Sequence, residues 1–222
     1  MMATHEPKTL TKALAQLPAE DPAFSRVVTV REYRRGEVIA TPDALNRNLF
    51  ILMKGQARLV RTTKEGRRLV LAVLEPGSIF GEGALLHAPT PDTFAEAQDE
   101  CTVWVIPAAE AQEMTDRHPI LGWGLLQTFG TRLAQVESRL EDVAYKKLPE
   151  RLAGLLLELA NYEETTITGT SHQALADTLG TYRETVSSIL RDFKRRGLVK
   201  LGYRRITVLD AYGLAEIAGL IY

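Results

Sequence analysis

The chain has 222 residues, of which 45% are hydrophobic and 25% are charged, and its formal net charge at pH 7 is −1. This composition is that of an ordinary globular protein of about two domains, and it excludes disordered and fibrous classes. The apolar runs fall short of the ~20 residues of a membrane-spanning helix, and the N-terminus lacks the apolar core of a signal peptide. We therefore expect a cytoplasmic protein without a membrane partner.

The first part of the chain predicts a short helical segment and then a domain of antiparallel strands. Leu10, Leu14 and Leu17 have helical spacing within an N-terminal segment, residues 1–22. Residues 23–118 contain short runs of apolar residues separated by glycines, as in a sandwich or barrel. The candidate strands are Arg26–Tyr33, Glu37–Thr41, Asn48–Met53, Gln56–Thr62, Arg67–Leu74, Thr93–Ala97 and Cys101–Ile106. A short helix over residues 107–118 ends this domain.

A long periodic helix is expected over residues 119–146. Its apolar residues recur at alternating spacings of three and four, the a/d pattern of a coiled coil. Polar residues, Arg132 among them, fill the exposed and flanking positions between. We interpret the stripe as the seam of a parallel homodimer; the alternative is one amphipathic helix packed on its own domain. The seam residues are Leu126, Phe129, Leu133, Val136, Leu140 and Val143.

The remaining residues, 147–222, predict a winged helix-turn-helix. Ser171 is a good N-cap for a helix that ends at Leu179, and Gly180 suits the tight turn that follows. A second helix is expected over residues 182–196, with Val186, Ile189, Leu190 and Phe193 facing inward. Such a helix can enter the major groove of DNA. Beyond it, residues 198–209 predict a hairpin that turns at Gly202 and Tyr203 and forms a wing.

Charge and residue type in this region favour DNA as the partner. Residues 180–205 hold eight basic and two acidic side chains, a net charge of +6 in a chain whose total is −1. A local surplus of this size is typical of phosphate contact. Arginine binds guanine, glutamate accepts from cytosine, and hydroxyls serve bases or phosphates. The candidate DNA-binding residues are Ser171, His172, Thr181, Tyr182, Arg183, Glu184, Thr185, Ser187, Ser188, Arg191, Arg204 and Arg205.

These features together resemble the CRP/FNR family of bacterial transcription regulators. The resemblance runs from about residue 25 to 210 and is most specific at Gly180–Val186, which reads GTYRETV. It implies an α+β chain made of an antiparallel β-roll sensor, a dimerisation helix and a C-terminal winged helix-turn-helix. By this similarity Arg183, Glu184 and Arg191 match positions that touch bases, whereas Ser188 stands where the family often has arginine. The resemblance also implies a homodimer that binds double-stranded DNA and RNA polymerase, with activation the commoner mode.

The sensor residues depart from the family's cyclic-AMP pattern. Gly81 and Glu82 are kept, but the residues that should supply an Arg-Ser phosphate grip read Pro89-Thr90-Pro91-Asp92-Thr93. An anion needs a cation or N–H donors to offset its desolvation. Where the family presents Thr and Ser to adenine, this chain has Val136 and Glu137. We therefore expect a regulator that needs no effector, and a cyclic nucleotide or an unusual effector is the alternative. The candidate effector residues are Gly81, Glu82, Asp92, Thr93, Val136 and Glu137.

Two other classes of function remain to be weighed. A β-roll that senses a small molecule and acts through a protein partner is possible, although it would not need the basic C-terminal region. For an enzyme we find no supporting motif, and the four histidines lack metal-ligand spacing, so we expect no catalytic residues and no metal site. The single cysteine, Cys101, cannot form a disulfide within the chain or hold an iron–sulfur cluster. Its alternation with Val103 and Val105 predicts a buried side chain.

Overall fold

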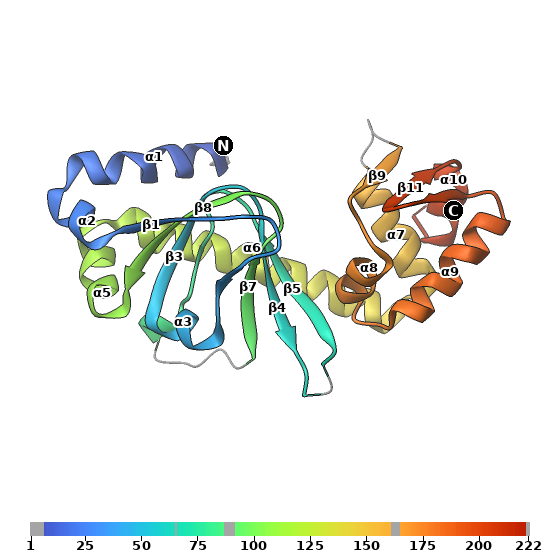
Figure 1. Ribbon diagram of the computed structural model, residues 1–222, viewed down its shortest axis with the longest axis horizontal. Helices are drawn as coiled ribbons and strands as arrows, with labels where there is room; N and C mark the ends of the chain where they lie inside the picture. Colours follow the sequence, from blue (N-terminus) through green and yellow to red (C-terminus); the bar gives the residue numbers. More distant parts are fainter. Residues whose placement is uncertain (1–6, 65, 87–91, 161–164, 221–222) are drawn as a thin grey trace. The chain divides into compact units, whose positions relative to one another are not determined.

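A computed structural model describes residues 7–64, 66–86, 92–160 and 165–220 (Figure 1). The chain forms two compact units. One comprises residues 1–66 and 71–136, and the other comprises residues 67–70 and 137–222. Among the described residues, none of the helices has both the length and the apolar character needed to cross a bilayer. The finer boundaries expected at residues 22, 118 and 146 stay a prediction.

The first unit is built on two four-stranded sheets, which confirms the predicted antiparallel β domain. One sheet has the order β1-β8-β3-β6 and the other β2-β7-β4-β5. A hydrophobic cluster with the stacked rings of Phe50 and Phe80 at its centre joins residues of both sheets. The strands are β1 (Thr29–Tyr33), β2 (Val38–Ala40), β3 (Asn48–Lys54), β4 (Ala57–Thr62), β5 (Arg68–Leu74), β6 (Ile79–Phe80), β7 (Thr93–Ala97) and β8 (Cys101–Pro107).

Short helices between the strands correct the sequence prediction in several places. The strand expected from Arg26 begins only at Thr29, because α2 (Pro22–Val27) precedes it. Asp21 caps α2 by accepting a hydrogen bond from the backbone N–H of Ala23 at 2.8 Å, and Pro22 suits the first helical turn. The same pairing of cap and proline starts α3 (Pro42–Arg47). The other short helices are α4 (Gly83–Leu86) and α5 (Ala108–Arg117).

The N-terminal segment packs on the first unit through the leucines that the sequence singled out. Helix α1 (Pro7–Glu20) buries Leu10, Leu14 and Leu17. They join a second hydrophobic cluster with Phe24 and with Leu121 of the long helix α6 (Pro119–Tyr145). The segment therefore has a structural role, as covering for one side of the unit's core.

The first half of α6 docks closely on the sheet. At Gly124 an added Cβ would lie 2.7 Å from Ile79 Cδ1, so a larger residue would force the Ile79 side chain to move. One turn later, the buried hydroxyl of Thr128 accepts a hydrogen bond from the Ile79 N–H at 3.0 Å and donates one to the Gly124 carbonyl at 2.8 Å. These contacts fix the rotation of the helix and thereby decide which of its faces points away from the core.

The second unit is a small helical domain with a three-stranded sheet. Its helices are α7 (Leu148–Ala160), α8 (His172–Leu179), α9 (Arg183–Arg195) and α10 (Ala211–Ile217), and its strands are β9 (Thr166–Thr168), β10 (Val199–Gly202) and β11 (Arg205–Val208). The strand order is β10-β11-β9, and the helices bury one shared apolar cluster. The predicted helix-turn-helix and wing are confirmed, whereas β9 and α10 were not anticipated.

The turn of the wing lies one residue later than predicted. Gly202 is still in β10 and pairs with Arg205, so the turn residues are Tyr203 and Arg204. Arg204 has φ 48°, a left-handed conformation that a side chain other than glycine rarely adopts. The hairpin therefore holds an arginine, rather than the glycine, at its strained position.

Candidate nucleic-acid interface and sensor site

The turn between α8 and α9 is built by local hydrogen bonds. The Ser171 hydroxyl caps α8 by accepting from the N–H of Ala174 at 3.0 Å. At its other end, Gly180 is left-handed with φ 68°, and the N–H of Thr181 donates to the Ala176 carbonyl at 3.0 Å. This closure is a glycine-dependent helix end. It confirms the reading of Ser171 and Gly180 as the punctuation of a helix-turn-helix.

Helix α9 separates an apolar face from a polar one. Val186, Leu190 and Phe193 are buried in the unit's core, and Ile189 is half-buried against it. The opposite face holds exposed polar side chains at its start, where a groove-binding helix makes its base contacts. The exposed residues are Arg183, Glu184, Thr185, Ser188 and Arg191. Because these side chains are exposed, this face is accessible to a partner.

A groove of about 460 Å³ connects α8, α9 and the wing. Its walls bring together six of the predicted DNA-binding or neighbouring polar residues from three separate segments, namely Thr170, Ser171, His172, Arg183, Arg204 and Arg205. Three of these are arginines, and none of the described residues that line the groove is acidic. Such a concave, cationic wall suits the phosphate backbone of a nucleic acid.

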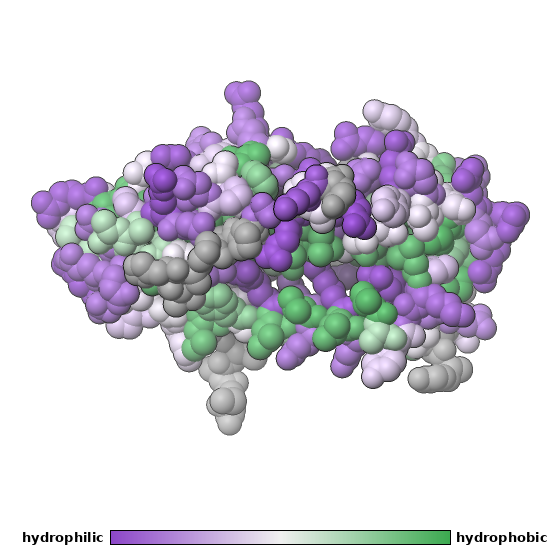
Figure 2. Space-filling model, turned by 90° about the horizontal axis from the view of Figure 1, so that it is seen from below, coloured by the Kyte–Doolittle hydropathy of each residue, from purple (hydrophilic) through white to green (hydrophobic). Residues whose placement is uncertain are grey.

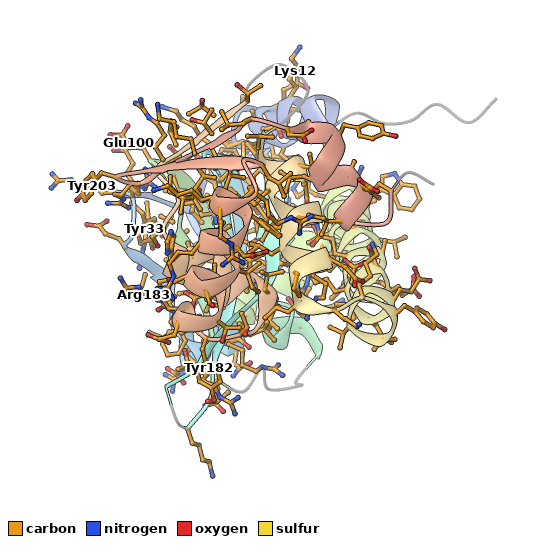
Figure 3. All side chains as sticks on the ribbon, turned by 90° about the vertical axis from the view of Figure 1, so that its right-hand side faces the viewer. Lys12, Tyr33, Glu100, Tyr182, Arg183 and Tyr203 are labelled. Carbon is orange, nitrogen blue, oxygen red and sulfur yellow. The ribbon has the colours of Figure 1, made fainter. Side chains whose placement is uncertain are left out.

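Two exposed tyrosines flank the groove. Tyr182 is the N-cap of α9 and is 58% exposed, and Tyr203 at the wing tip is 95% exposed. In Figure 3, Tyr182, Arg183 and Tyr203 project to the same side of the second unit. Tyr182 is one of the candidate residues predicted from the sequence, whereas Tyr203 is not. The position of Tyr203 beside Arg204 and Arg205 in a hairpin turn is the sequence signal that could have identified it.

The positive charge around α9 is partly neutralised locally. Asp192 forms ion pairs with Arg195 and Arg196, the second at 3.9 Å. These two arginines follow the polar face rather than line the groove, and their pairs are exposed and contribute little. Arg183, Arg204 and Arg205 carry the charge that faces the groove.

Two predicted contact residues are joined to each other. His172 Nδ1 lies 2.8 Å from the Ser187 hydroxyl oxygen, so the start of α8 is bonded to the second turn of α9. Both side chains are half-buried. Burial, helped by the positive charge of Arg183, lowers the pKa of His172 below its ordinary value of 6.5. The imidazole is consequently neutral at pH 7, and each ring nitrogen has a distinct role.

The apolar stripe on α6 is exposed in a single chain. Figure 2 shows a row of hydrophobic side chains along the lower edge of the surface. The exposed fractions are 58% for Leu126, 59% for Leu133, 53% for Val136, 67% for Leu140 and 58% for Val143. Phe129 differs, because it is half-buried and packs against the core of its own unit. A row of large apolar residues with this exposure marks a protein contact surface.

The candidate sensor residues have different local surroundings. Gly81 has φ 86°, and an added Cβ would lie 2.3 Å from the Asn48 carbonyl oxygen, so this glycine is structural. Thr93 is buried within β7, whereas Val136 and Glu137 are exposed on α6. Asp92 is left-handed, with φ 53°. Residues 89–91 of the predicted phosphate-grip stretch lie outside the described residues.

Glu82 has a partner that the sequence analysis did not anticipate. Arg132 Nη1 lies 2.8 Å from Glu82 Oε1, and the side chains are only 23% and 14% exposed. The expectation that Arg132 occupies an exposed flanking position is therefore wrong, because docking of α6 turns it toward the sheet. Arg132 brings a positive charge next to Glu82, where the neighbouring sequence has none. The carboxylate of Glu82 already compensates that charge.

Other reactive side chains have structural surroundings. Cys101 is buried, as predicted, and its Sγ donates to the Gln56 carbonyl at 3.1 Å. Burial, with the nearby Asp99 carboxylate, raises the pKa of this thiol, which makes it unreactive. Within the part of the chain that the structure describes, no three His, Cys, Asp or Glu side chains are grouped to hold a metal ion.

Two known protein families match this chain, one in each half of the sequence. The cyclic nucleotide-binding domain matches residues 30–118, and the Crp-like helix-turn-helix domain matches residues 150–217. The chain is 30% identical over 188 residues to the cyclic AMP receptor protein of Thermus thermophilus, covering 85% of this chain and 87% of that protein. It is also 30% identical over 194 residues to the transcriptional regulator SdrP of the same organism, covering 84% and 92%.

Solved structures agree with this assignment. A transcriptional regulator of the Crp/Fnr family from Eubacterium rectale superposes with a TM-score of 0.78 at 25% identity, covering 90% of this chain and 94% of that one. A CRP/FNR-family regulator from Thermus thermophilus superposes with a TM-score of 0.71 at 29% identity, covering 86% and 98%. Sequence and fold are therefore similar over nearly the whole length of these proteins.

Proposed function

Because this chain belongs to the CRP/FNR family of DNA-binding transcription regulators, and not to a family of enzymes, we propose that it acts as a homodimer on a pseudo-palindromic promoter site. Each subunit places α9 in the major groove, and the wing contacts the adjacent backbone. The half-sites are then about one helical turn, ~34 Å, apart, because the symmetry of the dimer is repeated in the DNA.

The observation that carries this proposal is the exposed polar face of α9 beside a cationic groove. Arg183 and Glu184 stand in the first turn of α9, exposed, where side chains reach base edges. The groove between α8 and the wing adds Arg204 and Arg205, whose charge suits phosphates. Base-reading and backbone-holding groups are thus adjacent, as in helix-turn-helix complexes.

The exposed stripe on α6 supports the dimer. Its members repeat with the a/d spacing over about five turns of one helix, and most are more than half exposed. A second copy of the same helix, packed in parallel, would cover all of them with matching residues. Phe129 would contribute from the edge of the seam, since part of its ring is already covered within its own unit.

The proposed output is contact with RNA polymerase, with activation as the mode, in the bacterial cytoplasm where promoter DNA lies. This part rests on family membership alone. A reporter driven by a promoter that contains the bound site tests it: expression should fall when the gene is deleted. A rise in expression on deletion would instead show repression.

For the sensor we propose that the dimer binds DNA without an effector. Arg132, the cation beside Glu82, is already in an ion pair with it, and this pairing leaves little net charge to attract a phosphodiester. A cyclic-nucleotide-dependent regulator is the second candidate, because residues 30–118 match the cyclic nucleotide-binding domain. Calorimetric titration with cyclic AMP and cyclic GMP, without and with DNA, separates the two. If either nucleotide binds at micromolar concentration and strengthens DNA binding, the chain is a cyclic-nucleotide-dependent regulator.

The decisive experiment for DNA recognition uses the full chain. Selection from a random duplex pool should yield a two-fold symmetric motif, and footprinting on that motif should show two protected half-sites. Arg47→Ala is a suitable control variant, because Arg47 is exposed on α3 of the first unit and forms an exposed ion pair with Asp43 at 3.1 Å. It should leave the footprint unchanged. Weak protection that ignores sequence would refute the proposal.

A further inference from the structure

The hydrogen bond between His172 and Ser187 assigns these residues a role different from direct base contact. They are 15 positions apart, and the contact of 2.8 Å is a side-chain hydrogen bond that joins the two helices of the motif. Both residues stand among polar groups that would meet DNA. Their mutual bond means that neither can be treated as an independent contact.

The ring of His172 connects two different environments. Its imidazole lines the cationic groove together with Ser171 and Arg183, while Nδ1 is occupied by the Ser187 hydroxyl. Only Nε2 remains for a ligand in the groove. For a phosphate to be held there, the proton of the neutral ring must be on Nε2.

This tautomer determines the direction of the second hydrogen bond. With its proton on Nε2, the ring has an acceptor at Nδ1, and the hydroxyl of Ser187 donates to it. The lowered pKa of His172, caused first by burial and then by the charge of Arg183, keeps the ring neutral and preserves this arrangement. In that tautomer the proton of the Ser187 hydroxyl points at His172 Nδ1.

We infer that His172 is a positioning residue, which couples a phosphate held at the start of α8 to the orientation of α9 through the Ser187 hydroxyl. This inference rests on the proposed function of α9 in DNA recognition. It assigns Ser187 to the support of the recognition helix, whereas Arg183 and its exposed neighbours touch the bases. Backbone contact and base choice are then linked through one side-chain pair.

A double-mutant cycle tests the coupling. Full-length wild type, His172→Ala, Ser187→Ala and the double variant are titrated with the duplex selected by the wild type and with a scrambled duplex of the same composition. A hydrogen bond of this kind corresponds to about a 3- to 10-fold change in affinity. Ser187→Ala should reduce the preference for the selected duplex by that factor in the wild-type background and by almost nothing in the His172→Ala background.

His172→Asn is the matched variant, since its amide can reach Ser187 from a position close to that of Nδ1 but has no group at Nε2. In this background Ser187→Ala should again reduce the preference. Two outcomes would show that Ser187 contacts a base directly and that the inference is wrong. One is that the effects of the two substitutions on the preference for the selected duplex multiply in the cycle. The other is that Ser187→Ala alters the selected motif at a single base pair. Thermal unfolding of each variant identifies any that lose their fold.

Nitrogen NMR provides a readout that a merely structural role would not give. The chain has four histidines, so selective labelling resolves the ring of His172. We expect a proton on Nε2 in the free protein, retained on binding the selected duplex. A proton on Nδ1 would overturn the inference. If the wild type selects no motif at all, the proposed function itself fails; if it selects one and the cycle is multiplicative, only this inference fails.

Discussion

Truncation of Leu140 gives a quantitative test of the proposed dimer. The side chain is 67% exposed in the single chain, and Leu→Ala removes three carbon atoms. Burial of each carbon stabilises by about 0.8 kcal/mol, so covering two thirds of them contributes about 1.6 kcal/mol per chain. A symmetric dimer buries two copies. Leu140→Ala should therefore weaken association by about 3 kcal/mol, or roughly 150-fold in the dissociation constant.

Sedimentation velocity over a range of protein concentrations measures this change. Leu159→Ala is a matched control, because Leu159 lies on α7, outside the stripe, and is 43% exposed. It should leave the dissociation constant as in the wild type. Equal behaviour of the two variants, or a wild type that stays a single chain at micromolar concentration, would refute the role of the stripe.

Three further outcomes are expected. Thr128→Val should leave the Ile79 N–H unpaired and reduce the free energy of unfolding by about 1–3 kcal/mol, whereas Thr128→Ser should retain most of the wild-type stability. Urea unfolding monitored by tryptophan fluorescence measures both variants. Equal losses of stability would show that the hydroxyl hydrogen bond is not the cause. Arg183→Ala should weaken binding to the selected duplex by about 1–3 kcal/mol and relax the preference for one base. Arg204→Ala should weaken binding to all sequences alike and make the affinity less dependent on salt concentration; an unchanged salt dependence would exclude phosphate contact by Arg204. Since the pKa of His172 is lowered in the folded state, the unfolded chain takes up the proton first as the pH falls. The contribution of His172 to stability is therefore full above pH 6.5 and declines below it. His172→Asn should flatten this part of the plot of melting temperature against pH, and an unchanged plot would show that another group titrates.

Local signals in the sequence were sufficient for the helix-turn-helix. A serine cap, a left-handed glycine and an apolar spacing of three and four placed α8 and α9 within about one residue of their observed ends. The same kind of signal was present but overlooked before α2 and α3, where a capping Asp21 or Thr41 precedes a proline. Those helices are only six residues long, too short for periodicity to reveal them.

The site was less predictable, because its contacts depend on how elements dock. Periodicity found the five exposed apolar residues of the α6 stripe but did not separate them from Phe129, which is half-buried. It could not show that Arg132 reaches Glu82, which is 50 positions earlier in the chain. That contact follows from the close approach at Gly124, which sets the rotation of the helix. The bond between His172 and Ser187 is a consequence of docking in the same way.

The charge distribution provides a reason why the recognition unit meets DNA first. Residues 180–205 carry +6 and the whole chain −1, which leaves −7 for all other residues. DNA therefore attracts the region around α9 and repels the rest of the chain. At physiological salt such forces extend only about 8 Å, so they act during the last approach and select among orientations rather than drawing the protein from a distance. A chain with the same total charge spread evenly would lack this selection, and for that reason the near-zero net charge is no argument against a nucleic-acid partner.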